Sequence, residues 1–322
     1  MHIPDGFLDA KTAVAAGALA AAGLGTALRQ ARLSLSRRRV PLLGLAAAFV
    51  FAAQMINFPV AGGTSGHLVG AVLAAVLLGP SAAVIVIATV LIVQCLMFAD
   101  GGVSALGANI LNMGVLAGVG GWLVYRGISR TFGGLFGRVL AAAFASWCGT
   151  VVAAIACAGE LAVSRTVAWS IAMPAMAGVH MLIGVGEGLI TALVLVAVAR
   201  ARPELLAPDP ATGPEGSYRT LVVYGALIAL GLALFASPLA SRWPDGLDRT
   251  TASLGFAARR TDPILAAPLP EYAMPGVYWS ALATSIAGAV GVVAAFVLSW
   301  VLARALVPRA GPEGAPTRGG AA

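Results

Sequence analysis

Long apolar runs, nearly free of charged residues, recur along most of this sequence and leave few folds open to it. A helix needs about 20 apolar residues to cross a bilayer, where each backbone polar group must be satisfied within the protein. With 59% of its 322 residues hydrophobic and 10% charged, the chain is too apolar for a soluble protein of this length. We therefore expect an all-α polytopic membrane protein. Its expected helices cover about residues 12–28, 41–56, 68–79, 82–98, 103–125, 139–163, 167–199, 218–236 and 277–303.

The chain is basic, with a net charge of +7 and a pI near 10.0, but its arginines lie between apolar runs without interleaved aromatic residues. This pattern is typical of membrane topology signals, so we predict contact with a lipid bilayer and no nucleic-acid partner. Positive residues collect on the cytoplasmic side of membrane proteins. With an external amino terminus, fourteen of the 20 Lys and Arg residues fall on the cytoplasmic side. We therefore expect a multi-pass protein whose amino terminus is external.

Enzymatic and redox functions lack support in the sequence. The three cysteines, Cys95, Cys148 and Cys157, lie inside apolar runs and form no C-x-x-C pair, so we interpret them as buried thiols. The chain has no H-E-x-x-H motif, no G-x-S-x-G motif and no G-x-x-x-x-G-K-[ST] loop for a nucleotide. We expect a non-catalytic protein without a cofactor.

The first two residues, Met1 and His2, form a candidate metal chelate. The terminal amine, the His2 backbone nitrogen if it is deprotonated, and the His2 imidazole can bind one metal ion through two fused rings. These rings hold the three nitrogens near one plane and leave one in-plane position open. Tetragonal nitrogen coordination favours Ni(II) or Cu(II) over zinc. The alternative is that His2 is an exposed residue on a frayed end.

A glycine-rich segment supplies a candidate for the fourth nitrogen. His67 lies in residues 57–70, next to a short apolar run that breaks at Gly79-Pro80-Ser81. Short, interrupted membrane segments of this kind often form binding sites near the bilayer midplane. A loop with several glycines can fold back between helices, where its backbone finds protein partners. The alternative is that His67 caps a helix at the membrane surface.

Further polar residues fall inside or beside the apolar runs, where they are costly and often functional. We expect some of them to hydrogen-bond the free ring nitrogen of a ligand histidine, although contacts between helices would explain each one equally well. His180 and Glu187 lie seven residues apart on one helical face and could line an ion path or form structural hydrogen bonds. The candidates at or near the outer helix ends are Gln54, Asn57, Asp100, Asn109 and Asn112.

Several of these segments resemble one family. Residues 1–8, MHIPDGFL, and residues 57–70 resemble the substrate-capture membrane subunit of nickel and cobalt transporters of the energy-coupling-factor (ECF) type. Weaker matches occur at residues 99–102, 107–114 and 180–188, and together they cover roughly residues 1–200. The resemblance implies a capture module of about seven helices in a prokaryotic inner membrane, with Met1, His2 and His67 as metal ligands. It also implies a transmembrane coupling subunit and cytoplasmic ATPases as partners, in separate chains.

The rest of the chain is expected to form a second module. Residues 201–217 are rich in proline and polar residues and predict a cytoplasmic linker, followed by two spans within residues 218–305. The external loop between them, residues 237–275, contains SPLASRWPDGL, which resembles the small accessory subunit of the same transporters. We interpret Pro244-Asp245-Gly246, which repeats Pro4-Asp5-Gly6, as another external turn. Residues 306–322 are expected to be disordered.

The sequence therefore predicts the substrate-specific component of an ATP-driven transporter that binds Ni(II) outside and delivers it to the cytoplasm. The same role for Co(II), feeding cobalamin biosynthesis, is the first alternative. An ion-driven secondary metal transporter is the second, and it would need polar relays through the membrane, for which only His180 and Glu187 are candidates.

Overall fold

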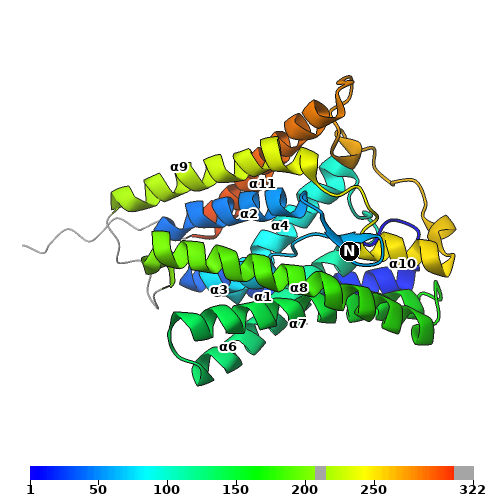
Figure 1. Cartoon of the computed structure of the whole chain (residues 1–322), viewed down its shortest axis with the longest axis horizontal. Helices are drawn as coiled ribbons and strands as arrows, with labels where there is room; N and C mark the ends of the chain where they lie inside the picture. The colour runs from blue at the N-terminus through cyan, green and yellow to red at the C-terminus, as the bar shows by residue number, and fades with distance from the viewer. Residues whose placement is uncertain (207–214, 308–322) are drawn as a thin grey trace, which may run out of the picture.

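The fold is a bundle of long helices that run roughly along the long axis of the molecule (Figure 1). The structure, a computed structural model, describes residues 1–206 and 215–307. We call these two parts the N-terminal module and the C-terminal module. The N-terminal module contains α1 (Ala10–Ser34), α2 (Val40–Gln54), α3 (Ala71–Leu78), α4 (Pro80–Phe98), α5 (Leu106–Asn109), a π-helical stretch (Ile110–Gly120), α6 (Gly121–Thr131), α7 (Gly134–Val163) and α8 (Trp169–Ala201).

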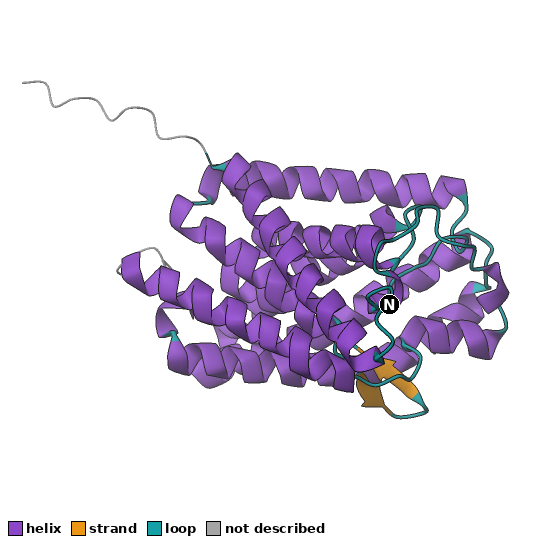
Figure 2. Cartoon of the chain, turned by 90° about the horizontal axis from the view of Figure 1, so that it is seen from above, coloured by secondary structure: helices purple, strands orange, loops and turns teal. Residues whose placement is uncertain are grey.

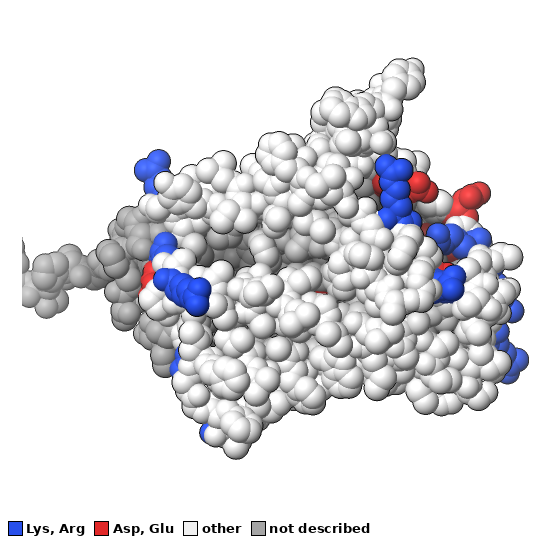
Figure 3. All heavy atoms as spheres, viewed as in Figure 1, with Lys and Arg blue, Asp and Glu red and all other residues white. Residues whose placement is uncertain are grey.

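Seven helices of the described residues are long and apolar enough to cross a membrane. Leu106–Thr131 counts as one of them, because α5, the π-helical stretch and α6 are continuous, while α2 is a shorter apolar helix. Charged side chains gather at both ends of the molecule and leave a broad uncharged band between them (Figure 3). The expected all-α, multi-pass membrane architecture is thus confirmed.

The segment between α2 and α4 contains a β-hairpin and a short, interrupted helix. Residues Phe58–Val60 (β1) and Thr64–Gly66 (β2) form a two-stranded antiparallel hairpin that the sequence analysis did not predict. Two glycines at its turn, Gly62 and Gly63, have positive φ angles, which non-glycine residues rarely adopt. The predicted break between α3 and α4 occurs at Gly79, whose φ of 93° places it outside the helical region. The hairpin and α3 thus bring His67 back into the bundle.

The C-terminal module packs against α2 and α4 of the N-terminal module. It contains α9 (Glu215–Gly231), a π-helical turn (Leu232–Ala236), α10 (Gly246–Leu254) and α11 (Ser280–Leu306). The approach of α11 to α2 is close, because a Cβ atom at Gly291 would collide with the Phe51 ring. The segment between α9 and α11, including α10, lies at the end of the bundle that holds the amino terminus (Figure 1), where many of the loops gather (Figure 2). Residues 207–214 of the predicted linker and residues 308–322 of the predicted tail lie outside the described residues.

Candidate metal centre

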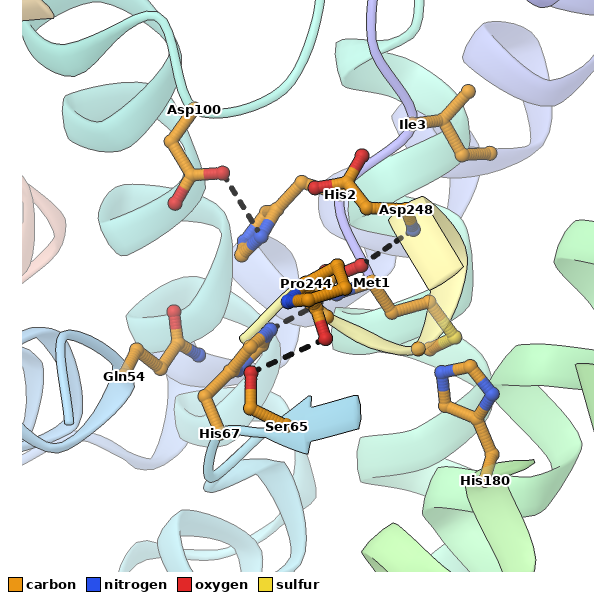
Figure 4. Close-up of polar contacts among 12 residues, drawn as sticks. Met1, His2, Ile3, Gln54, Ser65, His67, Asp100, His180, Pro244 and Asp248 are labelled. Carbon is orange, nitrogen blue, oxygen red and sulfur yellow. Dashed lines mark hydrogen bonds and ion pairs between the residues drawn. The ribbon is translucent and has the colours of Figure 1, made fainter. Parts of the chain in front are cut away.

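The first residues of the chain are folded into the molecule and do not fray from it. Met1 and His2 are only 4% and 8% exposed, and Ile3 is fully buried. The side chain of Asn109 holds the Ile3 peptide from both sides: its Oδ1 accepts from the Ile3 nitrogen at 2.8 Å, and its Nδ2 donates to the Ile3 oxygen at 3.1 Å. Gly6, with a φ of 89°, turns the chain toward α1. The terminal amine therefore has a defined position inside the bundle (Figure 4).

The Met1 amine lies between His67 and an aspartate of the other module. Its nitrogen is 2.9 Å from His67 Nε2 and 2.7 Å from the Asp245 carboxylate. Two nitrogen ligands at adjacent corners of a square, with bonds of about 2.0 Å, lie about 2.8 Å apart. The amine and His67 are thus already at the separation that a shared metal ion requires.

The protonation of His67 follows from its two contacts. Its Nδ1 lies 3.1 Å from the backbone oxygen of Leu68, which can only accept a hydrogen bond, so Nδ1 carries the proton. Nε2 then has a free lone pair directed at the amine. Burial, the Met1 ammonium and His2 together lower the pKa of His67 to about 3. The ring is therefore neutral near pH 7, as a metal ligand must be.

A chain of hydrogen bonds through α4 and α2 fixes the tautomer of His2. The Val69 oxygen accepts from Gln54 Nε2 at 2.8 Å, so Gln54 Oε1 faces Gln94 and accepts from Gln94 Nε2 at 2.8 Å. Gln94 Oε1 is then the acceptor that lies 3.1 Å from His2 Nε2. His2 Nε2 must therefore be the protonated nitrogen, and Nδ1 keeps a lone pair. The direction of the whole chain depends on one backbone carbonyl, which cannot donate.

The same chain continues to α8. Glu187 accepts hydrogen bonds from the backbone nitrogens of Val69, at 2.6 Å, and Gly70, at 3.0 Å. It thereby holds the turn at Gly70, whose φ is 75°, directly after His67. We call these linked residues of the N-terminal module, Gln94, Gln54, Val69, Gly70 and Glu187, the floor of the site.

The lone pair of His2 Nδ1 faces a carboxylate. Asp100 Oδ1 lies 3.2 Å from Nδ1, and Asp100 Oδ2 accepts from the Tyr272 hydroxyl at 2.6 Å. The His2 and His67 rings are stacked, with centroids 5.2 Å apart and planes 19° apart. A lone pair and a carboxylate oxygen repel each other unless positive charge lies between them. This side of His2 therefore favours a cation.

The C-terminal module covers the site from the opposite side. Asp245 caps the first turn of α10, where its Oδ1 accepts from the Asp248 nitrogen at 2.8 Å, while its Oδ2 binds the Met1 amine. The hairpin holds this segment in place, because Ser65 Oγ donates to the Trp243 oxygen at 2.6 Å and the Ser65 nitrogen donates to the Pro244 oxygen at 2.8 Å. We call Trp243, Pro244, Asp245 and Tyr272 the cap of the site.

The charges of the cap and the amine shift each other's pKa values. Burial alone would lower the pKa of the Met1 amine, but the charge and hydrogen bond of Asp245 outweigh burial and raise it. Burial would raise the pKa of Asp245, and the Met1 ammonium reverses this effect and lowers it. Burial lowers the pKa of His2, although Asp100 acts in the opposite direction. Near pH 7 the charged groups of the site are therefore the Met1 ammonium and the carboxylates of Asp245 and Asp100.

Side chains alone do not make up this centre. Among residues 1–206 and 215–307, no group of three or more His, Cys, Asp or Glu side chains is arranged to hold a metal ion. The candidate donors around Met1 include main-chain nitrogens, namely the terminal amine and the His2 backbone nitrogen, together with the imidazoles of His2 and His67. A search for clustered side-chain ligands would miss a site of this kind.

The other sequence candidates are divided between the site and its surroundings. Gln54, Asp100, Asn109 and Glu187 have the contacts described above, and His180 lines a cavity beside His67. Asn57 contributes its backbone oxygen, which accepts from the Ser241 nitrogen. Asn112 instead donates to Glu160 of α7 at 2.7 Å.

Three residues at the site were missed by the sequence analysis: Gln94, Asp245 and Tyr272. Gln94 had a usable signal, since it is a buried amide within α4, a largely apolar helix of 19 residues. Asp245 was interpreted only as part of a turn, and its place at the start of a short helix, with Asp248 three residues later, was the signal that was overlooked.

Two family models together match most of this chain. Residues 2–205 match the family model described as the cobalt uptake substrate-specific transmembrane region. The chain belongs to this family. Residues 219–307 match a second model, the PDGLE domain, and the matched segment includes Asp245 and α10.

Two relatives match nearly the whole length of this chain. A protein of Archaeoglobus fulgidus named as a fused nickel transport protein is 40% identical, over 94% of this chain and 98% of that protein. A fused nickel transport protein of Rhodobacter capsulatus is 36% identical, over 97% and 100% respectively. A crystal structure of a truncated transition metal transporter is 34% identical, has a TM-score of 0.57, and covers 62% of this chain and 99% of that chain. The chain thus has a role in metal transport.

Proposed function

We propose that this chain is the substrate-specific component of an ATP-driven transporter of the ECF type, which binds Ni(II) on the outer side of the membrane and delivers it to the cytoplasm. One observation carries the proposal. The Met1 amine, His2 and His67 meet in a buried cluster, with the amine and His67 Nε2 2.9 Å apart. An amino terminus has no need of such a position for folding alone.

The substrate would be held by four nitrogens: the Met1 amine, the His2 backbone nitrogen, His2 Nδ1 and His67 Nε2. Binding displaces one proton from the ammonium and one from the backbone nitrogen. The two displaced protons match the two charges of the metal ion, so the net charge of the buried cluster does not change. This balance limits the cost of burying a divalent ion, which is high for an uncompensated charge.

Nickel is supported by the planar donor set and by the two relatives named for nickel transport. Co(II) can accept the same four nitrogens and is the second candidate. It is supported by the family description and by a cobalt transport protein of Geobacter sulfurreducens, 32% identical over 82% of this chain and 80% of that protein. The optical spectrum of the loaded protein separates the two metals.

The energy source is expected to be ATP in separate cytoplasmic subunits, coupled through a further transmembrane subunit. An ion-driven mechanism is less compatible with the polar contacts in the membrane. Both carboxylate oxygens of Glu187 accept backbone hydrogen bonds from the loop after His67, so this residue anchors the loop. Metal uptake that persists in ATP-depleted cells with an intact ion gradient would contradict the ECF assignment.

The ligand set is tested by His67→Ala. We expect the variant to lose high-affinity Ni(II) binding, because the chelate then lacks its fourth in-plane nitrogen, while the protein still inserts into the membrane. Calorimetric titration of the purified full chain with Ni(II) measures the loss. Asn57→Ala, in the same loop, serves as a control and should bind Ni(II) like the wild type. Near-normal binding by His67→Ala would place the fourth ligand elsewhere.

A further inference from the structure

His180 borders a small cavity next to the proposed metal centre but contacts none of the donors assigned to it. The cavity has a volume of about 10 Å³, and Met1, His67, His180, Asp245 and Gly246 are among the residues that line it. A space of this size is close to the least that holds a single water molecule. His67 and His180, both labelled in Figure 4, each line this cavity.

The ring of His180 has one nitrogen occupied and one free. Its Nδ1 lies 2.7 Å from the backbone oxygen of Met176, so Nδ1 carries the proton and donates it. Its Nε2 therefore has a lone pair. This atom is buried and has no hydrogen-bond partner among the described residues. Buried polar atoms without partners are rare in native proteins, and each one requires an explanation.

The two histidines beside the cavity share one arrangement. In His67, as in His180, Nδ1 donates to a backbone oxygen and Nε2 keeps its lone pair. Histidines that bind metal ions usually donate their other ring proton in this way, which fixes the tautomer and the ring orientation. His180 thus has the form of a metal ligand, although it is not part of the four-nitrogen centre.

Gly246, the residue directly after Asp245 of the cap, packs against the His180 ring. A Cβ atom at Gly246 would lie 2.7 Å from Cε1 and 2.9 Å from Nε2 of His180. Any other residue at position 246 would therefore press on the ring. Because glycine has no side chain, nothing from position 246 occupies the lone pair of His180 Nε2.

We propose that His180 is a transfer ligand for the transported divalent cation, which it binds together with His67 after the cation leaves the amino-terminal chelate. This inference rests on the proposed function. Three of the four nitrogens of the chelate belong to Met1 and His2, so a cation moving into the bundle must leave them. His67 and His180 belong to the body of the module and border the same cavity.

The position of His180 on α8 indicates the direction of transfer. Glu187 and Thr191 follow it on the same buried face of the helix, farther from the amino-terminal end of the bundle. Thr191 accepts a hydrogen bond from Ser146 of α7 at 3.1 Å, so polar groups continue along the contact between α7 and α8. Two imidazoles hold a cation less tightly than a chelate with four nitrogens. A transfer ligand of this kind therefore binds the cation without trapping it.

The test uses Co(II) alone, titrated into the purified full chain and followed by its optical spectrum. His2→Ala removes the chelate and should leave weaker binding that depends on His180. We expect the double variant His2→Ala/His180→Ala to bind Co(II) at least about tenfold more weakly than His2→Ala. In the wild-type background, His180→Ala should change the affinity of the tight site less than about threefold.

Two further variants control for folding and for loss of a polar atom. His180→Leu fills the volume of the ring without a donor and should reproduce the effect of His180→Ala. Ser299→Ala removes another buried polar atom without a partner, in α11, and should have no effect on Co(II) binding.

Equal Co(II) affinity in His2→Ala and His2→Ala/His180→Ala would overturn the proposal. Loss of the tight site in His180→Ala or His180→Leu would also overturn it, because His180 would then belong to the first centre. Failure of the proposed function has a different signature: the wild-type chain itself would bind neither Ni(II) nor Co(II) tightly.

Discussion

The floor and the cap contact the same few donor atoms but use different interactions. The floor, formed by the N-terminal module, consists of hydrogen bonds between neutral amides, backbone groups and one carboxylate that accepts from the backbone. The cap, contributed by the C-terminal module, relies on charge, since Asp245 pairs with the Met1 ammonium and Asp100 binds Tyr272.

The floor and the cap therefore depend differently on the protonation of the Met1 amine. The hydrogen bonds of the floor do not depend on whether the amine is protonated, so they can hold the donor nitrogens in place in both the empty and the loaded state. The ion pair of the cap exists only while the amine carries its proton. With the proposed ligand set, metal binding is therefore expected to change the cap and leave the floor as it is.

The largest expected effect comes from breaking the register between the amine and the floor. One alanine inserted between Met1 and His2 retains every side chain but enlarges the chelate by a peptide unit. Because Asn109 and Gln94 fix the positions of Ile3 and His2, the amine is displaced from His67. Metal uptake should fall as far as in His2→Ala, measured with radioactive nickel in cells, while membrane insertion is unchanged.

An alanine inserted between Gly62 and Gly63, at the exposed turn of the hairpin, provides the control for lengthening the chain near the site. This second insertion should leave uptake largely intact. Uptake near the wild-type level in the first insertion variant, with His2→Ala inactive, would refute the amino-terminal chelate and favour a simpler site of two histidine side chains.

The helices that carry the floor, and the proposed ligands beside it, could be predicted from the sequence alone. Apolar length predicted the spans, and the break at Gly79-Pro80 predicted the interrupted segment, because both follow from local physical rules. The three proposed ligands were singled out from the first residues and one glycine-rich loop, and the structure places them together. Their role as ligands stays a prediction.

Long-range pairing was the part that could not be predicted. Which carbonyl orients Gln54, and through it Gln94 and His2, depends on how α2, α4 and the loop at Val69 pack, and a single sequence contains no direct signal for that. The contact of the cap with the amine could not be predicted either, because Asp245 lies 244 residues from Met1 in the chain. The hairpin at β1 and β2 was missed because three-residue strands are too short for a periodic pattern.

The next largest effect is expected from the floor itself, in Glu187→Gln. The carboxylate accepts from two backbone nitrogens, whereas an amide offers one oxygen and would turn its NH₂ group toward the other backbone donor. The turn after His67 should shift, and metal affinity should fall about 10–100-fold, as is usual when a group that orients a metal ligand is altered. Calorimetry with Ni(II) measures the change.

Glu160→Gln is the matched control, because Glu160 is also a membrane carboxylate but binds Asn112, away from His67. It should change Ni(II) affinity less than about threefold, against the 10–100-fold expected when a group that orients a metal ligand is lost. Equal losses in the two variants would mean that Glu187 acts through general stability and that the floor does not position the ligand.

The smallest effect is expected from the cap, and it should depend on pH. In Asp245→Asn the side chain still caps α10, since Asn and Asp are similarly good caps, but the negative charge beside the amine is lost. At alkaline pH, where the amine is already free, the variant should bind metal more weakly than the wild type, because less negative charge offsets the cation. At lower pH the amine proton competes with the metal, and this competition is stronger in the wild type, where Asp245 raises the pKa of the amine.

The difference in affinity between the wild type and Asp245→Asn should therefore be largest at high pH and shrink as the pH falls. Calorimetric titrations with Ni(II) at several pH values measure this trend. Asp248→Asn removes the same charge three residues away, where the carboxylate pairs with Arg260 and raises the pKa of the amine less than Asp245 does, so the pH trend of its affinity should stay closer to that of the wild type. A constant difference between Asp245→Asn and the wild type at every pH would show that the cap contributes only its charge, and that its ion pair with the amine does not oppose metal binding.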